Sequence, residues 1–144
     1  MARINKVAHV VLNVADVEAS TKFYSEALGM EVMSFLSFGA QHHDIALFRA
    51  PEGLEHSERG LTHVAMQIEG GVEELNQLYQ RLVDCGATIG GMFEHNVSKS
   101  VYFFDPDGNR LEIFCEVMEM EEARRVIREQ GGGMKPFAFE AATV

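Results

Sequence analysis

The chain carries an internal repeat, in which the same order of structural elements occurs twice. A strand pattern around His9, VAHVVLNV, leads into a helix pattern, VEASTKFYSEAL. The same order returns 54 positions later around His63, where THVAMQI leads into VEELNQLYQRLVDC. Extended stretches follow each helix: MEVMSFLSF and HDIALFRA in the first half, and ATIGGMFEH, SVYFFD and NRLEIFCEV in the second. The repeat predicts two βαβββ modules, at about residues 5–55 and 60–117.

Residues typical of helix ends delimit both predicted helices. Asp16 is a good N-cap for the first helix, and Gly29 and Gly86 are expected to end the first and second helices. A loop at Pro51 to Gly60 separates the modules. We expect residues 1–117 to form one α+β domain, and residues 118–144 to form a C-terminal helix and tail joined by a flexible GGG. The helix would pack on the domain or on a partner chain.

Composition and charge limit the classes of partner. The 144 residues are 47% hydrophobic and 24% charged, as in an ordinary globular domain. The net charge is −10 and the 12 basic residues are scattered, which argues against binding to nucleic acid. We see no signal peptide in residues 1–13 and no stretch long enough to span a membrane. Because there are only two cysteines and eight methionines, we expect a reduced, cytoplasmic protein.

Three potential metal ligands stand at matching places in separate strand patterns. His9 and His63 open the first strand of each module, and Glu112 lies in the last strand pattern. Side chains alternate along a strand, so all three lie on the less apolar face, where a cavity would be lined. Two histidines and one carboxylate leave coordination positions open for a substrate. A single strand histidine is more often a surface residue, but the repeated position favours a site.

The segment between the last two strands adds a second signal. DPDGN is a dense turn motif that any hairpin could use. The longer stretch SVYFFDPDGNRLEIF, however, resembles the signature of the vicinal oxygen chelate superfamily. That superfamily includes glyoxalases, fosfomycin-resistance transferases, bleomycin-binding proteins and type I extradiol dioxygenases. Together with the paired modules, the resemblance covers nearly all of Val7 to Val117.

The resemblance implies a cupped mixed sheet around a divalent metal, with His9, His63 and Glu112 at the ligand positions. Glyoxalases of this family are expected to offer a fourth protein ligand late in the first module. The stretch LFRAP supplies no carboxylate or imidazole there until Glu52. This departure weakens the interpretation as a glyoxalase.

Three further residues are similar to those of extradiol dioxygenases. In HDIALF, His43 resembles the acid–base histidine of those enzymes, and Tyr102 matches their substrate-binding tyrosine. His95 resembles a further histidine upstream of that tyrosine. The resemblance thus implies catalytic roles for His43, Tyr102 and His95.

The function implied is cleavage of a small aromatic diol by O2, with Fe(II), or with Mn(II) or another divalent metal, in a homodimer. Many extradiol enzymes carry two module pairs, whereas this chain has one. Several alternatives stay open on the same fold. They are a fosfomycin-type thiol transferase, a glyoxalase- or epimerase-type lyase or isomerase, and a non-catalytic protein of the bleomycin-resistance kind.

Overall fold

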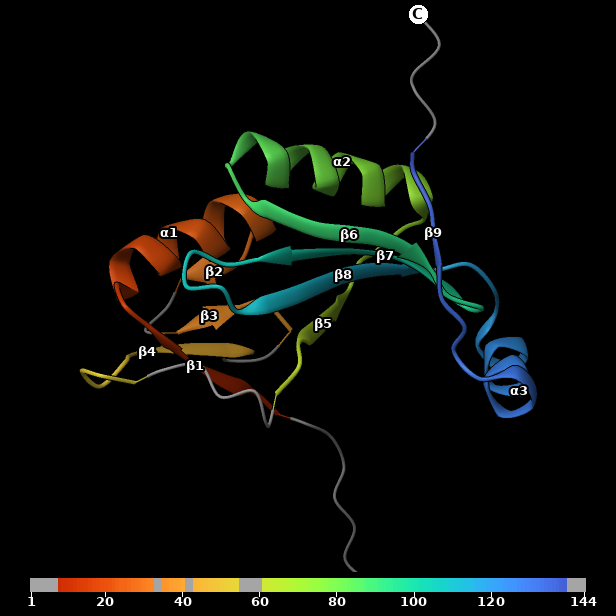
Figure 1. The fold of residues 1–144 in the computed structure, drawn as a ribbon, viewed down its shortest axis with the longest axis horizontal. Helices are drawn as coiled ribbons and strands as arrows, with labels where there is room; N and C mark the ends of the chain where they lie inside the picture. The colour runs from red at the N-terminus through yellow and green to blue at the C-terminus, as the bar shows by residue number, and fades with distance from the viewer. Residues whose placement is uncertain (1–7, 33–34, 41–42, 55–60, 140–144) are drawn as a thin grey trace, which may run out of the picture. The chain divides into compact units, whose positions relative to one another are not determined.

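Two mixed sheets, one in each half of the chain, form the framework of the computed structural model (Figure 1). The structure describes residues 8–32, 35–40, 43–54 and 61–139. The chain divides into two compact units, Met1–Glu58 and Arg59–Val144. Residues 55–60 of the predicted loop and 140–144 of the predicted tail lie outside the described residues.

The first unit holds a four-stranded sheet and one helix. Its elements are β1 (Val10–Val14), α1 (Val17–Leu28), β2 (Glu31–Val32), β3 (Leu36–Ser37) and β4 (Ile45–Arg49). The strand order is β1-β4-β3-β2, with β1 parallel to β4 and the other pairs antiparallel. A parallel pair needs a crossover connection, and α1 lies within the connection between β1 and β4.

The second unit repeats this plan and extends it. Its elements are β5 (Val64–Gln67), α2 (Val72–Asp84), β6 (Thr88–Glu94), β7 (Ser98–Phe104), β8 (Arg110–Glu116), α3 (Met120–Gln130) and β9 (Lys135–Pro136). The strand order is β5-β8-β7-β6-β9, with β5 parallel to β8. Each unit therefore begins with a strand, a helix and three further strands, and its first strand pairs with the third of these. The predicted α+β class is confirmed.

Local signals explain where the helices begin and end. The Asp16 carboxylate accepts a hydrogen bond from the Ala19 amide at 3.0 Å, and Gly29 ends α1 with a left-handed φ of 69°. At the start of α2 the Glu74 carboxylate accepts a hydrogen bond from the Gly71 amide at 2.8 Å, and this bond lowers the pKa of Glu74. The predicted N-cap and the glycine stop of α1 are confirmed.

The cores of the two units follow the predicted alternation. On β1, Leu12 and Val14 are buried whereas Val11 is exposed, and on β5 Met66 is buried. Helix residues and the inward-facing strand residues complete these cores, among them Tyr24, Ala27, Leu75, Leu82, Phe103, Leu111 and Ile113. Val17 and Val72, which start the two helices, are exposed. Among the described residues, no helix is long and apolar enough to cross a membrane.

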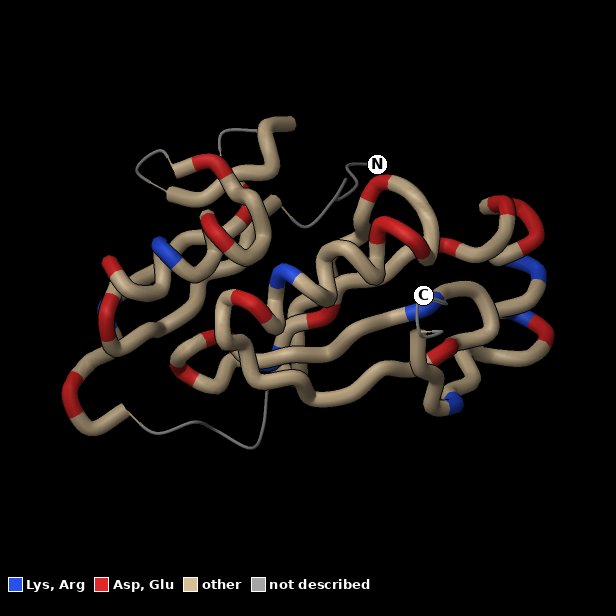
Figure 2. Tube along the Cα trace, turned by 90° about the horizontal axis from the view of Figure 1, so that it is seen from above, with Lys and Arg blue, Asp and Glu red and all other residues tan. Residues whose placement is uncertain are grey.

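Charge is spread over the described chain. Figure 2 shows that Lys and Arg positions are spread along the trace and interleaved with Asp and Glu. On α3, Arg125 contacts Glu122 and Glu129 at 3.8 and 3.1 Å. This pattern suits the solvent-facing side of a helix.

The turn between β7 and β8 is organised by one buried carboxylate. Asp105, which is 5% exposed, accepts hydrogen bonds from the amides of Asp107 and Asn109 at 2.9 and 2.8 Å. The Asn109 side-chain amide donates a third bond at 2.7 Å. Gly108 adopts a left-handed φ of 82°. The DPDGN motif therefore has a structural role whatever the protein does.

Replacing Asp105 with alanine is expected to lower the free energy of unfolding by about 3 kcal/mol, because donors that face a buried carboxylate lose their acceptor. Urea denaturation measures this change. Replacing Asp84, an exposed residue at the end of α2, with alanine serves as the matched control and should shift stability by less than about 0.5 kcal/mol. Equal stabilities of the two variants would contradict the structural role of Asp105.

The C-terminal tail, for which the sequence indicated no regular structure, adds a strand to the second sheet. β9 pairs antiparallel with β6, placing Pro136 opposite Phe93 and Lys135 opposite Glu94. Further along, Phe139 packs against Tyr79 of α2 with ring centroids 5.4 Å apart. The tail thus lies along β6 and reaches α2 (Figure 1).

Candidate metal and substrate site

In the first unit the structure brings together two of the predicted residues, His9 and His43. Their ring centroids lie 4.4 Å apart. The His43 ring also contacts the ring of Phe35, with centroids 4.9 Å apart. His9 directly precedes β1 and His43 lies two residues before β4. Because Val10 pairs with Ile45 in parallel register, the two histidines lie at the same end of this strand pair.

The neighbour of His43 holds its loop in place. The Asp44 carboxylate accepts a hydrogen bond from the Phe38 amide at 2.8 Å, and the Asp44 amide donates to the Leu36 carbonyl at 2.8 Å. The carbonyl of Asp44 also accepts from the Val10 amide at 3.1 Å. These bonds tie the segment that carries His43 to both neighbouring strands.

In the second unit His63 and Glu112 form a close pair. His63 Nε2 lies 3.0 Å from Glu112 Oε2, and the two side chains are 31% and 9% exposed. The pair follows from the parallel register of β5 and β8, in which Ala65 lies opposite Glu112. The other ring nitrogen of His63, Nδ1, is buried without a hydrogen-bond partner in the structure.

This pair fits a divalent cation. An imidazole nitrogen and a carboxylate oxygen are both common ligands of divalent cations, and His63 Nε2 and Glu112 Oε2, 3.0 Å apart, are close enough to bind the same ion. Across the residues that the structure describes, no group of three His, Cys, Asp or Glu side chains could hold a metal ion. Coordination of one ion by His9 together with His63 and Glu112 stays a prediction.

Tyr102 stands directly beside the carboxylate of this pair. It lies opposite Glu112 in the antiparallel pairing of β7 with β8, and its ring meets that of His63 edge to face at 5.4 Å. Burial raises the pKa of Tyr102, and the negative charge of Glu112 raises it further, while Arg110 acts in the opposite direction. The Arg110 guanidinium carbon lies 4.6 Å from the centre of the tyrosine ring. The phenol is therefore kept protonated at neutral pH.

His95 completes the group in the second unit. Its Nε2 lies 3.1 Å from the Tyr102 hydroxyl, and its Nδ1 lies 2.8 Å from the carbonyl oxygen of Gly133. The structure thus brings together His63, Glu112, Tyr102 and His95 in one unit, and His9 and His43 in the other. The catalytic roles assigned to His43, Tyr102 and His95 stay predictions.

Several neighbours of these residues were missing from the sequence-based site. Arg110 and Phe93 contact the ring of Tyr102, the latter edge to face at 5.8 Å. Arg110 could have been included, because alternation places it on the same strand face as Glu112. Strand alternation could not identify Phe35 and Gly133, because each lies in an irregular stretch of chain. Which residues such a stretch contacts depends on the whole fold.

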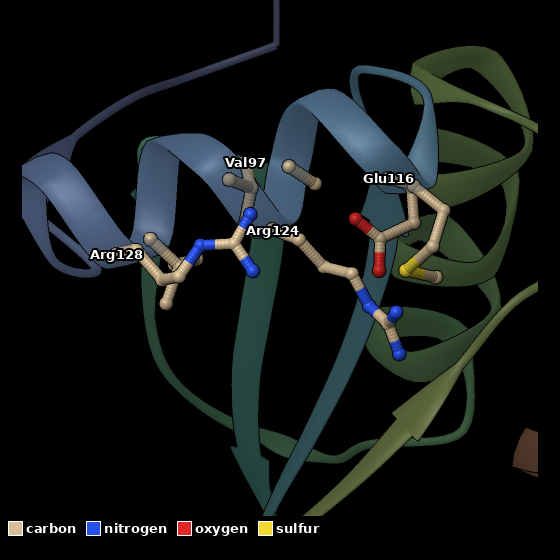
Figure 3. A pocket seen from close by; sticks show the side chains of 7 residues that line it. Val97, Glu116, Arg124 and Arg128 are labelled. Carbon is tan, nitrogen blue, oxygen red and sulfur yellow. The ribbon is translucent and has the colours of Figure 1, made fainter.

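Two other features of the second unit lie apart from these residues. A groove of about 370 Å³ runs beside α3, with Arg124 and Arg128 coming from the helix and Glu116 from β8 (Figure 3). None of the predicted site residues lines it. Cys115 is fully buried, and burial raises the pKa of its thiol, so it is poorly suited to be a nucleophile.

Comparison with known proteins identifies the family. Residues 6–113 match the family model described as the Glyoxalase/Bleomycin resistance protein/Dioxygenase superfamily. Biphenyl-2,3-diol 1,2-dioxygenase 2 from Rhodococcus globerulus is 32% identical over 122 residues, which are 78% of this chain and 64% of that protein. The chain therefore spans less than two thirds of the length of this dioxygenase.

A transferase is about as similar as the dioxygenase. Glutathione transferase FosA from Serratia marcescens is 30% identical over 118 residues, which are 76% of this chain and 80% of that protein. Among solved structures, a glyoxylase/bleomycin resistance protein/dioxygenase domain from Frankia sp. EAN1pec shares the fold. It has a TM-score of 0.67 and 24% identity, and the match covers 79% of this chain and 99% of that chain. With its two similar modules and the match over residues 6–113, the chain belongs to the glyoxalase/bleomycin resistance protein/dioxygenase superfamily.

Proposed function

We propose that this protein is a metal-dependent extradiol-type dioxygenase that cleaves a catechol-like aromatic diol with O2. The observation that carries the proposal is the position of Tyr102. Its hydroxyl lies within hydrogen-bond distance of His95, and its residue is directly opposite Glu112 of the His63–Glu112 pair. A carboxylate, a phenol and an imidazole are thus adjacent, as a reaction that moves the protons of a bound diol requires.

Each residue of the site would have a separate role in this reaction. His63 and Glu112, together with His9, would hold Fe(II), or alternatively Mn(II) or another divalent metal. The ion would supply Lewis acidity and one-electron exchange, leaving open positions for small ligands. Tyr102 would hydrogen-bond one oxygen of the diol. His43, whose imidazole is intrinsically suited to proton exchange near neutral pH, would take a proton from the reacting group and return it.

A second candidate function is thiol transfer of the fosfomycin-resistance kind. It is favoured by the similarity to FosA, which is 30% identical and of which the match covers 80%, more than it covers of the dioxygenase. The same metal pair could serve such a reaction. The segment HDIA, which carries His43 beside His9, resembles extradiol dioxygenases and does not specifically support thiol transfer.

Reconstitution with Fe(II) under anaerobic conditions, followed by exposure to air with simple catechols and bicyclic diols, tests the proposal. We expect O2 uptake and a coloured ring-fission product. Parallel samples with Mn(II), a thiol and an epoxide test the alternative. Persistent inactivity towards both kinds of diol, with Fe(II) demonstrably bound, would overturn the dioxygenase assignment, and absence of bound metal would favour a non-catalytic binding protein. The homodimer stays a prediction.

A further inference from the structure

We propose that the main-chain carbonyl of Gly133, in the C-terminal tail, keeps the proton of neutral His95 on Nδ1. The Nε2 atom of His95 then faces Tyr102 as a proton acceptor. Gly133 is then a positioning residue. A catalytic role for this form of His95 rests on the proposed function, whereas the position of the proton on His95 does not.

The tail segment that carries this carbonyl is fixed on both sides. The Asn96 amide donates to the Gly132 carbonyl at 2.7 Å, and the Asn96 side chain donates to the Gly131 carbonyl at 2.8 Å. On the other side β9 pairs with β6, and Lys135 Nζ lies 3.5 Å from the Glu94 carboxylate. The Gly133 carbonyl is therefore held between two anchored stretches, 2.8 Å from His95 Nδ1.

The chemistry of a carbonyl decides which nitrogen of His95 carries the proton. A carbonyl oxygen only accepts hydrogen bonds, so Nδ1 must carry a hydrogen to bond with it. In the neutral ring, Nε2 then has a lone pair and lies 3.1 Å from the Tyr102 hydroxyl, where it competes with the Glu112 carboxylate for the single phenol proton. The neutral form protonated at Nε2 is disfavoured because it would place a lone pair against the carbonyl.

This arrangement gives a path for one proton. When a diol hydroxyl loses its proton to Tyr102 Oη, the phenol proton passes to His95 Nε2. The diol is then an anion, Tyr102 is neutral, and His95 is an imidazolium whose Nδ1–H still donates to Gly133.

The outer end of this path borders solvent. A groove of about 340 Å³ is lined by Glu94, His95, Asn96, Met134 and Lys135. Glu94 and Lys135 are also the residues that join β6 to β9 at this point. A proton held by His95 can therefore leave through the side where the tail meets the sheet.

Two neighbouring glycines provide a matched pair of variants. A Cβ at Gly133 would lie 2.5 Å from Asn96 Oδ1, at a left-handed φ of 59°, so Gly133→Ala strains this backbone and pushes aside the Asn96 side chain that holds the Gly131 carbonyl. A Cβ at Gly132 meets nothing within 4 Å, so Gly132→Ala leaves the neighbouring carbonyl in place. Asn96→Ala, which releases the Gly131 carbonyl, is a second disrupting variant in case Gly133→Ala fails to fold.

The test is nitrogen-15 NMR of the histidine rings in the metal-free protein, with His95→Gln to assign the signals. We expect wild type and Gly132→Ala to show His95 protonated at Nδ1, and Gly133→Ala and Asn96→Ala to show an average of both neutral forms. Protonation of wild-type His95 at Nε2, or an unchanged Nδ1–H signal in a folded disrupting variant, would overturn the proposal. This result does not depend on activity, so it is distinguishable from failure of the proposed function.

A kinetic measurement then tests the use of the path. In protein loaded with Fe(II) and acting on a diol, Gly133→Ala should lower kcat roughly tenfold with KM and metal content unchanged, as expected when a proton-transfer group is misplaced. Gly132→Ala should keep the wild-type kcat. An unchanged kcat in Gly133→Ala would contradict a role of the path in turnover.

Discussion

Replacing Glu112 with alanine is expected to weaken binding of Fe(II) by more than about 100-fold, since even residues that only support metal ligands contribute 10- to 100-fold. The variant removes a carboxylate that is 9% exposed and lies 3.0 Å from His63 Nε2. His63 would remain as the one predicted ligand in this unit, and one neutral nitrogen ligand holds a hard cation poorly. Metal content after dialysis, together with calorimetric titration of the metal-free protein, measures the loss.

Glu116 supplies the matched control for this variant. It lies on the same strand, β8, and on the same face, four residues beyond Glu112, so its removal changes the charge of the protein equally. Glu116→Ala should bind Fe(II) as wild type does. Full metal binding by Glu112→Ala, or equal losses in the two variants, would show that the His63–Glu112 pair is not a metal site.

Replacing His43 with alanine should slow turnover by about 10² to 10⁴-fold while leaving the metal bound, because general acid–base groups contribute factors of this size. The ring lies 4.4 Å from that of His9, which places a proton-exchanging group beside a predicted ligand. Rates of O2 consumption, measured together with metal content, separate the two effects. His9→Ala should instead lose the metal.

His43→Phe controls for packing in the same cluster. A phenyl ring can keep the contacts with His9 and Phe35, which lie 4.4 and 4.9 Å from the His43 ring, but it cannot exchange a proton. We therefore expect His43→Phe to be as slow as His43→Ala. A full rate in either variant would exclude His43 as the acid–base group.

The sequence predicted those parts of the fold and site that depend on local pattern. Alternation correctly separated Leu12, Val14 and Met66, which are buried, from the opposite strand faces that carry His9 and His63. Asp16 and Gly29 marked the ends of α1 because capping depends on neighbouring residues. The predicted nearness of His63 and Glu112 followed from the repeat, since parallel first and last strands bring them together.

The remaining contacts depend on residues distant in the chain. The bond between His95 and Gly133 joins positions 38 residues apart, and a run of three glycines signals only flexibility. Phe35 meets His43 only once β3 has paired with β4. Two-residue strands such as β9 carry too few side chains for alternation to reveal them.

The position of β9 has a consequence for how sheets of different molecules can join. An uncovered edge strand offers main-chain donors and acceptors on which another chain can add a strand. β9 occupies part of the outer edge of β6, near Phe93 and Glu94, and Pro136 lacks a main-chain donor of its own. At the other edge of the described sheet lies β5. At Phe93 and Glu94, strand addition from a neighbouring molecule would first have to displace β9.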